Sequence, residues 1–233
     1  VEGVLIGEFG EERRVLVDMQ SVPPVLVNAI IAAEDERYYQ HAGIDYVGVA
    51  RAAYANLLTG GRRQGASTIT MQVARNFFLS REKTITRKLR EVLLAWRIEA
   101  NLSKDEILQL YVNQIFLGQR AYGFAAAAQI YFGKPLADVS IAQAAMLAGL
   151  PKAPSAYNPV NNPKRAKTRQ AYVLRRMHEL RFIDDNQYRE AQSAPLGVRQ
   201  GLRDATPTHA EFVAEMARQV VIDAYGDDAY TKG

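Results

Sequence analysis

The chain has 233 residues, a length that fits one sizeable domain with a small lobe or extension. Hydrophobic residues make up 48% and charged residues 23%, so the chain can build a core and is not a disordered polyelectrolyte. The net charge of +4 suits an anionic partner without naming one, and the lack of cysteine excludes disulfides and thiolate metal sites.

The two ends of the sequence suggest a piece of a longer protein. The chain starts at Val1 without a methionine and stops on GDDAYTKG, which does not resemble a natural end. No apolar run reaches the length of a membrane span, and no signal peptide is present. We therefore expect a fragment whose parent protein could carry an anchor elsewhere.

A short β-hairpin is expected at the N-terminus, followed by helices almost throughout. Residues 4–17 predict two short strands around a turn at Gly10 and Glu11. Apolar periodicity, capping patterns and Gly or Pro stops predict the helices. The first helix begins at Pro23-Pro24, and the next three cover about 46–58, 68–79 and 84–102. Capping pairs start three further helices: Ser103 with Glu106, Ser140 with Gln143, and Asp184 with Gln187. The remaining helices cover about 121–132, Asn162-Pro163 to about 181, and about 210–225. Residues 59–68 are predicted to form a mobile loop, and residues 196–209 a linker.

An acid pair, Glu34 and Asp35, follows the apolar run VLVNAIIAA. One interpretation is an ordinary helix end whose charges face water. The other is a carboxyl group held in apolar surroundings, which raise its pKa until it can accept or donate a proton near neutral pH. The local sequence leaves both interpretations open.

The stretch TITRKLREVLLAWRIEA predicts a helix that is apolar on two sides of a small charged cluster. The charged cluster consists of Arg87, Lys88 and Glu91, which meet at i, i+3 and i, i+4 spacing. A helix that is apolar nearly all round tends to be buried, and a buried charge must be paired or functional. The alternative is an ordinary surface salt bridge between Arg87 and Glu91.

Other charged and polar stretches give weaker signals. Ser67 or Thr68 could cap the helix in RQGASTITMQVARNFF, and a helix N-terminus near arginines can bind an oxyanion or phosphate, although no P-loop pattern is present. The histidines lack metal-ligand spacing. The basic residues within 164–181 fit a solvated helix face better than a nucleic-acid interface, so no nucleic-acid partner is expected.

Taken in order, these stretches resemble the peptidoglycan glycosyltransferases (glycosyltransferase family 51), specifically the glycosyltransferase domain of class A bifunctional penicillin-binding proteins. The family motifs E-D-x-x-F-x-x-H-x-G, G-x-S-T-I-T-Q-Q followed by K-N, R-K-x-x-E and K-x-x-I-L-x-x-Y-x-N match EDERYYQHAG, GASTITMQVARN, RKLRE and KDEILQLYVN. Three positions depart from the pattern: Tyr38 replaces Phe, Met71 replaces Gln and removes a hydrogen-bonding side chain, and Arg75 replaces Lys with a different geometry.

The resemblance implies a mainly α fold with a lysozyme-like large lobe and a smaller, membrane-contacting jaw lobe. Residues 1–20 would be an N-terminal strand and linker, 21–195 the glycosyltransferase domain with its jaw lobe at about 44–84, and 196–233 a linker and helix that lead toward a missing transpeptidase module. Some apolar side chains of the jaw could face lipid, but we expect most of them to be core residues: Val47, Val49, Tyr54, Leu57, Leu58, Phe77 and Phe78.

The resemblance also implies a reaction, the polymerisation of lipid II into glycan strands. The 4-OH of an acceptor GlcNAc would attack C1 of the donor MurNAc, invert it, and release undecaprenyl pyrophosphate. Glu34 matches the general base and Glu91 the second essential acid. The residues that match the pyrophosphate cations and the polar contacts of the donor region are Arg75, Arg87, Lys88, Thr68 and Gln72.

Partners and location are implied in the same way. The partners would be lipid II, the growing glycan strand, the membrane surface, the transpeptidase module of the same parent chain, and moenomycin-type inhibitors. No cofactor would be required, although a divalent cation (Mg²⁺ or Mn²⁺) could accompany the pyrophosphate. The protein would work at the outer, periplasmic face of the bacterial cytoplasmic membrane.

Two alternatives remain. A lysozyme-like hydrolase or lytic transglycosylase would need no set of cations such as Arg75, Arg87 and Lys88 beside a second carboxylate. An inactive wall-binding module would have no need of Glu34 and Glu91.

Overall fold

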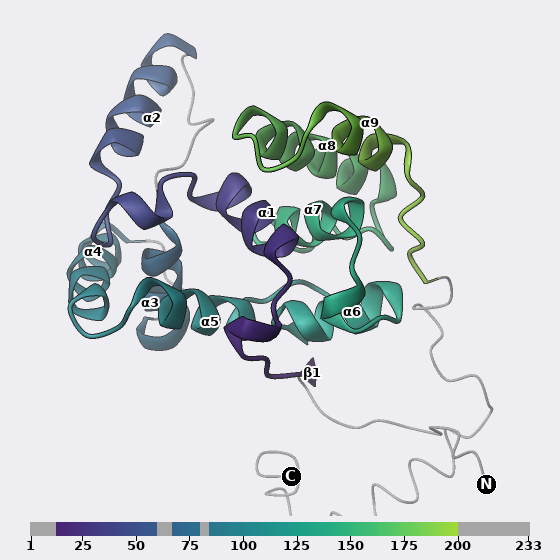
Figure 1. Cartoon of the computed structure of the whole chain (residues 1–233). Coiled ribbons are helices and arrows are strands. Elements are labelled where there is room, and N and C mark those ends of the chain that lie inside the picture. Colours follow the sequence, from purple (N-terminus) through teal and green to yellow (C-terminus); the bar gives the residue numbers. More distant parts are fainter. Residues whose placement is uncertain (1–12, 60–66, 80–83, 200–233) are drawn as a thin grey trace, which may run out of the picture.

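The computed structural model describes residues 13–59, 67–79 and 84–199, and this part of the chain is mainly helical, as expected (Figure 1). Its strands are β1 (Arg13–Arg14) and β2 (Ala121–Tyr122). Its α-helices are α1 (Pro24–Glu34), α2 (Tyr46–Thr59), α3 (Ile69–Phe78), α4 (Ile85–Glu99), α5 (Lys104–Gln114), α6 (Phe124–Phe132), α7 (Ile141–Gly149), α8 (Pro163–Glu179) and α9 (Asp185–Ser193). Short 3₁₀ turns lie at Met19–Ser21, Tyr38–Gln40 and Leu136–Asp138.

The predicted helix boundaries follow from local capping chemistry. Each predicted capping box has both of its reciprocal hydrogen bonds: Ser103 with Glu106, Ser140 with Gln143, and Asp184 with Gln187. Gly133 ends α6 in the left-handed conformation, with φ of 66°. Residues 60–66 of the predicted mobile loop (59–68) lie outside the described residues, as does the last predicted helix (210–225).

The N-terminal β-structure differs from the expected hairpin. β1 pairs with β2 in parallel, with Arg13 opposite Ala121, while residues 4–12 of the predicted hairpin lie outside the described residues. The segment after β1 is tied to α5, because Asn113 accepts a hydrogen bond from the Val17 N–H (2.9 Å) and donates one to the Val17 carbonyl (2.8 Å). A pairing between segments a hundred residues apart leaves no local signal in the sequence.

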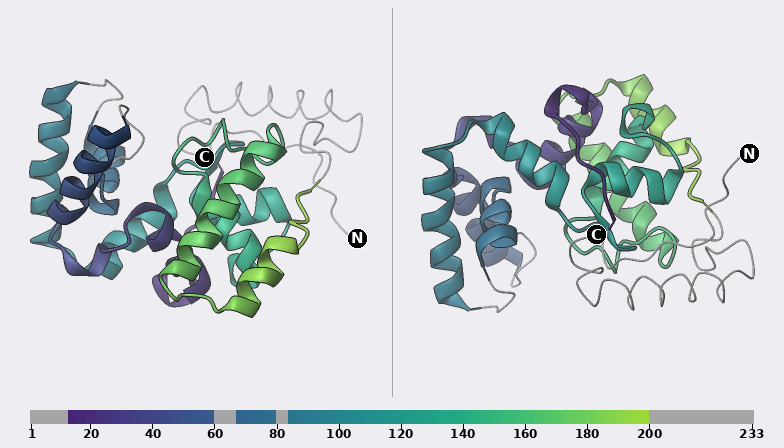
Figure 2. Two further views of the ribbon diagram at one scale, coloured as in Figure 1. Left: turned by 90° about the horizontal axis from the view of Figure 1, so that it is seen from above. Right: turned by 90° about the horizontal axis from the view of Figure 1, so that it is seen from below.

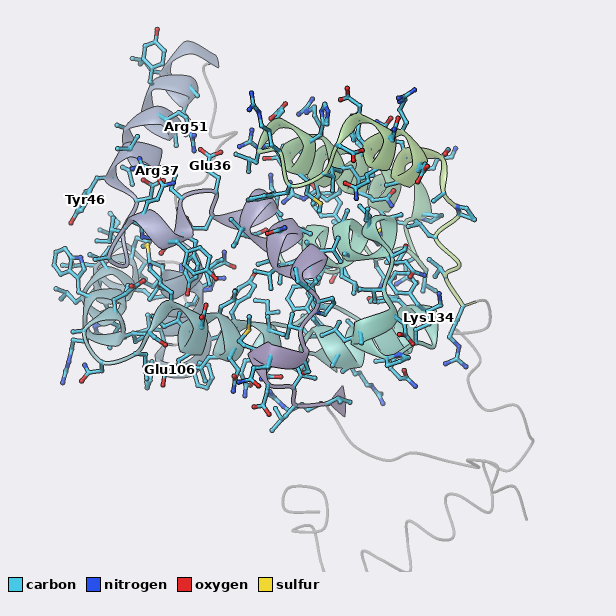
Figure 3. All side chains as sticks on the ribbon, in the orientation of Figure 1. Glu36, Arg37, Tyr46, Arg51, Glu106 and Lys134 are labelled. Atoms are coloured by element: carbon cyan, nitrogen blue, oxygen red, sulfur yellow. The ribbon has the colours of Figure 1, made fainter. Side chains whose placement is uncertain are left out.

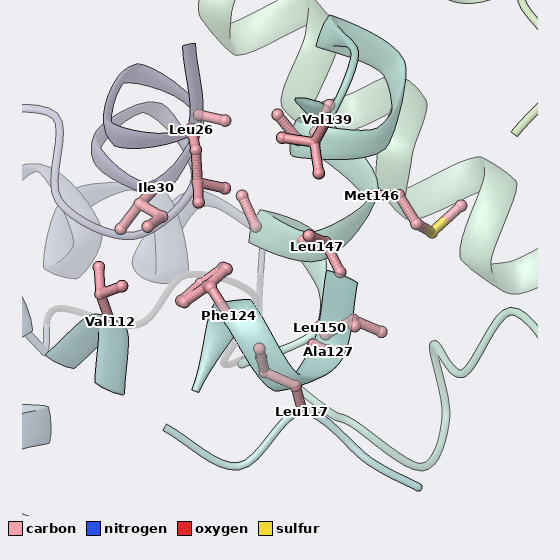
Figure 4. Packing of buried hydrophobic residues seen from close by; sticks show 14 of the residues in the cluster. Leu26, Ile30, Val112, Leu117, Phe124, Ala127, Val139, Met146, Leu147 and Leu150 are labelled. Atoms are coloured by element: carbon pink, nitrogen blue, oxygen red, sulfur yellow. The ribbon is translucent and has the colours of Figure 1, made fainter. Parts of the chain in front are cut away.

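The core lies where α1 packs against α7 and α8, with α5 and α6 beneath them (Figure 4). Leu26 and Ile30 of α1 are fully buried against side chains such as Phe124 and Leu147. Each such side chain contributes about 1.5–3 kcal/mol by leaving water. Alanines cover much of α6 and α7, so these helices can pack closely.

The helices divide into two groups in space. α2, α3 and α4 gather at one end of the molecule and α6 to α9 at the other, with α1 and α5 between them (Figures 1 and 2). None of the described helices is both long and apolar enough to cross a bilayer. The predicted jaw boundaries at 44–84 remain a prediction.

The expectation that the apolar residues of the jaw are core residues was wrong. Val47, Val49, Tyr54, Leu57, Phe77 and Phe78 are all exposed, and the side chain of Leu58 lies outside the described residues. α4 adds Ile85, Leu89, Leu93 and Trp96, which share one side of the helix and are also exposed, Ile85 to 91%. We call these ten exposed residues the exposed apolar face. The predicted burial of α4 therefore holds only on the side that carries Glu91 and Ala95.

Replacing Gly123 by Ala is expected to lower the free energy of unfolding by about 3 kcal/mol, at the upper end of what one strained residue costs. Gly123 precedes α6 with φ of 85° and ψ of 156°, a region open essentially to glycine alone, and an added Cβ would lie 2.7 Å from the Asn113 carbonyl oxygen. Gly197→Ala is the matched control, because Gly197 also has positive φ (61°) but an added Cβ would lie 3.9 Å from Gln143 Nε2. Urea denaturation of both variants measures the difference, and equal losses would contradict the role of the close approach.

Candidate active site

A cavity of about 870 Å³ lies between the two groups of helices. Its walls come from the end of α1, one side of α2, one side of α3, the connection after α7, and α8. Charged side chains dominate this lining: Glu34, Asp35, Glu36, Asp45, Arg51, Arg75, Lys152, Arg169, Arg175, Arg176 and Glu179. A cavity that combines acids with an excess of cations suits an anionic substrate that undergoes proton transfer.

Glu34 is the last residue of α1, whose buried face carries it to the cavity wall. Its side chain is only 12% exposed. Gln72 donates a hydrogen bond from Nε2 to Glu34 Oε2 (2.9 Å), and Arg169 Nη2 lies 3.5 Å from Oε1. Burial raises the pKa of Glu34 above its ordinary value, and this outweighs the lowering by Gln72 and Arg169. Of the two interpretations of the acid pair, the structure agrees with the carboxyl group in low-dielectric surroundings.

Asp35 fixes the start of α3. Its Oδ2 accepts a hydrogen bond from the Ile69 N–H (3.1 Å), and its Oδ1 lies 2.9 Å from His41 Nε2. A carboxylate at a helix N-terminus satisfies a free N–H group and the helix dipole. The two adjacent acids therefore have different surroundings. Asp35 holds the start of α3 close to the end of α1, next to Glu34.

α3 presents three of the predicted site residues. Thr68 caps the helix, and its hydroxyl donates to the Gly43 carbonyl (2.6 Å) while accepting from the Met71 N–H (3.2 Å). Gln72 faces Glu34 one turn later, and Arg75 lines the cavity in the last turn. Within the described part of the chain no acidic side chain pairs with Arg75, so its charge is available to a ligand.

Glu91 lies on α4 behind the cavity, with its side chain 1% exposed. Lys88 Nζ donates to Glu91 Oε2 (2.7 Å), and Arg87 Nε lies 3.2 Å from Oε1. The alternative of a surface salt bridge is therefore wrong. Arg87, Lys88 and Glu91 are not among the residues that line the cavity, but Lys88 Nζ also donates to the hydroxyl of Ser67 (2.8 Å), which does line it.

The predicted site residues thus form two groups. Glu34, Gln72 and Arg75 face the cavity, with Thr68 beside them in its wall. Arg87, Lys88 and Glu91 form a charged cluster one layer behind, in which Glu91 is buried while Lys88 is partly exposed, and Lys88 joins the cluster to the cavity through Ser67.

The counterion of Glu34 is Arg169, which the sequence did not indicate as a site residue. Arg169 was assigned to a solvated basic face of α8, and it is in fact buried beside Glu34, with its guanidinium 4.5 Å from the centre of the Tyr172 ring. The signal was its position: Arg169 lies on the same side of the helix as Ala166 and Val173, which are buried. A basic residue on the apolar side of an amphipathic helix must be paired or functional.

The site offers little to a metal ion. The described residues bring no three histidine, aspartate or glutamate side chains together as a metal site. Glu91, the acid of the charged cluster, already has both oxygens engaged by Arg87 and Lys88. The described residues therefore hold no preformed site for a divalent cation.

Comparisons with known proteins identify the family of the chain. Residues 2–178 match the family model described as Transglycosylase. The chain is 56% identical over 232 residues to penicillin-binding protein 1A of Neisseria meningitidis serogroup A and 48% identical over 233 residues to that of Pseudomonas aeruginosa. All of the chain is covered, but only 29% and 28% of those proteins, so it spans less than a third of their length.

A solved structure supports the same assignment. The crystal structure of penicillin-binding protein 1A from Haemophilus influenzae matches 98% of this chain and 24% of its own, with a TM-score of 0.60 and 30% identity. The mainly helical, lysozyme-like architecture is therefore that of the glycosyltransferase region of such proteins. The chain belongs to the transglycosylase family.

Proposed function

We propose that this chain is a peptidoglycan glycosyltransferase that polymerises lipid II into glycan strands. The observation that carries the proposal is Glu34, a carboxyl group with a raised pKa, facing a cavity rich in arginine and lysine. Membership of the transglycosylase family supports the reaction class.

Glu34 is the general base in this proposal. Its carboxylate accepts the proton of the acceptor GlcNAc 4-OH as that oxygen forms a bond to C1 of the donor MurNAc. Gln72 and Arg169 hold the carboxylate from two sides, so it needs little reorganisation at the moment of transfer. The proton ends on Glu34, and the configuration at C1 inverts because the displacement is single.

The leaving group is undecaprenyl pyrophosphate, whose bond to C1 breaks as the new bond forms. Arg75 is the cation of the cavity wall that meets it, and Arg87 and Lys88 add positive charge from behind Ser67. Fixed cations stabilise the negative charge that develops on the departing phosphate. Glu91 holds Arg87 and Lys88, the two cations of the charged cluster, in place.

A hydrolase of similar shape is the main alternative. It would pass the glycosyl group to water and would leave the cations of α3 and α4 without a ligand. An experiment with labelled lipid II separates the two: the glycosyltransferase makes strands from lipid II and leaves preformed glycan intact. Cleavage of preformed glycan with no strands from lipid II would overturn the proposal.

We also propose that the exposed apolar face contacts the membrane that carries lipid II. Its residues come from α2, α3 and α4, which gather at one end of the molecule (Figure 2). Apolar patches of this kind mark interaction surfaces.

The proposed reaction also implies a location and further partners. The chain would work at the periplasmic side of the bacterial cytoplasmic membrane, as part of a parent protein with a transpeptidase module. Its cavity would be the target of moenomycin-type inhibitors.

The double variant Phe78→Gln/Leu89→Gln is expected to bind anionic phospholipid vesicles about tenfold more weakly, because two exposed side chains would no longer enter the apolar part of the bilayer. Vesicle co-sedimentation measures the effect. The matched control is Val15→Gln/Leu16→Gln, which alters two exposed apolar residues outside α2 to α4. An equal loss in both double variants would show that this face has no special part in membrane binding.

A further inference from the structure

Glu36 connects the two sides of the cavity. Arg51 of α2 donates a hydrogen bond from Nη1 to Glu36 Oε1, and Arg176 of α8 donates one from Nη2 to Oε2. Figure 3 shows Arg51 and Glu36 side by side, between α2 and the near end of α8. All three residues line the cavity that contains Glu34. One carboxylate is therefore bound by guanidinium groups from opposite walls.

The two arginines are held differently. Arg51 is half exposed and extends from α2, whereas Arg176 is mostly covered and also donates from Nη1 to Glu179 Oε2. Glu36 remains partly open to solvent. The ion pair between Arg51 and Glu36 is screened by solvent on the Arg51 side, so exchanging the carboxylate at Arg51 costs less than breaking a fully buried pair.

We propose that Arg51 and Arg176 form a carboxylate-binding subsite, and that Glu36 fills this subsite while the enzyme is free. The ligand is a carboxylate of the peptide stem that the sugar substrate carries. On substrate binding, the carboxylate of the stem takes the place of Glu36 between the two guanidinium groups. The inference rests on the proposed function, because the substrate must carry a peptide.

The shape of the subsite favours a carboxylate over the pyrophosphate. Each oxygen of Glu36 receives one guanidinium group, so the two arginines are spaced for one planar carboxylate. The cations assigned to the pyrophosphate, Arg75, Arg87 and Lys88, come from α3 and α4 instead. The pyrophosphate therefore has another place to bind.

Glu36 lies close enough to Glu34 for its subsite to receive the peptide branch of a sugar bound at Glu34. Glu36 follows Glu34 by two residues, so their Cα atoms lie at most about 7 Å apart. A sugar ring held at Glu34 can thus direct its peptide branch toward Arg51 and Arg176. Recognition of the stem at this point would set the register of the sugar relative to the base.

The test measures binding of a soluble probe, N-acetylmuramoyl-pentapeptide, by titration calorimetry at low salt. Glu36→Gln removes the internal competitor and is expected to bind the probe about tenfold more tightly, equivalent to 1.4 kcal/mol. Arg51→Gln, added to Glu36→Gln, is expected to abolish the gain. Glu179→Gln is the matched control, because it removes one negative charge from the same wall and from the same Arg176 without touching Arg51.

Each result decides the matter. A gain in Glu36→Gln alone supports the subsite, whereas no gain, or an equal gain in Glu179→Gln, overturns it. A gain for inorganic pyrophosphate but not for the peptide overturns the assignment to a carboxylate. If Glu36→Gln does not fold, as judged by circular dichroism, Arg51→Gln alone must weaken binding of the probe for the proposal to stand. Because binding is measured without turnover, failure of the polymerisation assay remains a separate outcome.

Discussion

Glu34→Gln is expected to lower the rate of strand formation from lipid II by about 10²–10⁴-fold, the usual contribution of a general base. The amide keeps the size of the side chain and can still accept a hydrogen bond from Gln72, but it cannot take the proton of the attacking hydroxyl. The measurement is the initial rate of polymer formation from labelled lipid II, read on a gel.

The control for this prediction is Glu179→Gln, which removes a carboxylate from the same cavity without touching Glu34. Its rate should fall far less than that of Glu34→Gln, because Glu179 contacts Arg175 and Arg176 of the cavity wall and does not take the proton. If Glu34→Gln retained most of the activity while Glu179→Gln lost it, the base would have to be sought elsewhere in the cavity.

The raised pKa of Glu34 predicts how both activity and stability depend on pH. The carboxylate must be ionised to act as a base, so kcat/KM should fall with decreasing pH through a pKa above the ordinary value of 4.5. Stability moves in the opposite direction. Between 4.5 and the raised pKa the native state binds more protons than the unfolded chain, so this contribution to the free energy of unfolding decreases as pH rises. Glu34→Gln should lack that slope in urea denaturation at a series of pH values.

Burial that gives Glu34 its chemistry thus weakens the fold at neutral pH. The same conflict explains why the local sequence left its role open. The end of an apolar helix is compatible both with a solvated acid and with a buried one, and only the packing of α3 and α8 decides between them. Gln72 and Arg169 come from 38 and 135 residues further along the chain. The partners of Glu34 are set by tertiary structure and leave no local pattern, although the place of Arg169 on the apolar side of α8 indicates that it is buried.

What could be predicted depends on short-range chemistry. The capping boxes at Ser103, Ser140 and Asp184 were predicted correctly because the reciprocal hydrogen bonds lie within one turn. The family motifs placed Glu34 and Glu91, but they gave no distance between them, and the structure puts Glu91 outside the lining of the cavity.

Exposure was the least predictable property. The periodicity of α4 was read correctly, yet the side with Leu89 and Trp96 is exposed and the side with Glu91 is buried. A hydrophobic pattern identifies the face that avoids water but does not say whether protein or lipid covers it. The ion pairs of Glu36 with Arg51 and Arg176 could not be predicted either, because they join residues that lie far apart in the sequence.

Glu91→Gln is expected to slow strand formation by about 10²-fold, comparable to the loss of one group that stabilises developing charge. It should also lower the free energy of unfolding by about 1–3 kcal/mol, since Glu91 is buried and its carboxylate binds both Arg87 and Lys88. Arg87 and Lys88 both depend on Glu91, and Lys88 carries the connection to Ser67 in the cavity wall. Rates from lipid II and urea denaturation measure the two effects.

Glu99→Gln is the matched control, because Glu99 lies on the same helix and is also mostly covered. It accepts hydrogen bonds from the hydroxyl of Thr70 (2.6 Å) and from Lys104 Nζ (2.6 Å), outside the lining of the cavity. This variant should lose stability while keeping its rate per folded molecule. A parallel loss of rate in Glu99→Gln would mean that activity follows the stability of α4 in general.

Binding of inorganic pyrophosphate separates the role of Glu91 from simple destabilisation. In Glu91→Gln the two cations no longer share their charge with a carboxylate, so pyrophosphate should bind more tightly, while the rate falls because Arg87 and Lys88 are no longer held in one geometry. If Glu91 only stabilised the fold, Glu91→Gln would lower both the affinity for pyrophosphate and the rate of strand formation. Tighter binding of the leaving group with slower turnover is therefore the signature that Glu91 acts by positioning the cations behind Ser67, and weaker binding with slower turnover would remove that role.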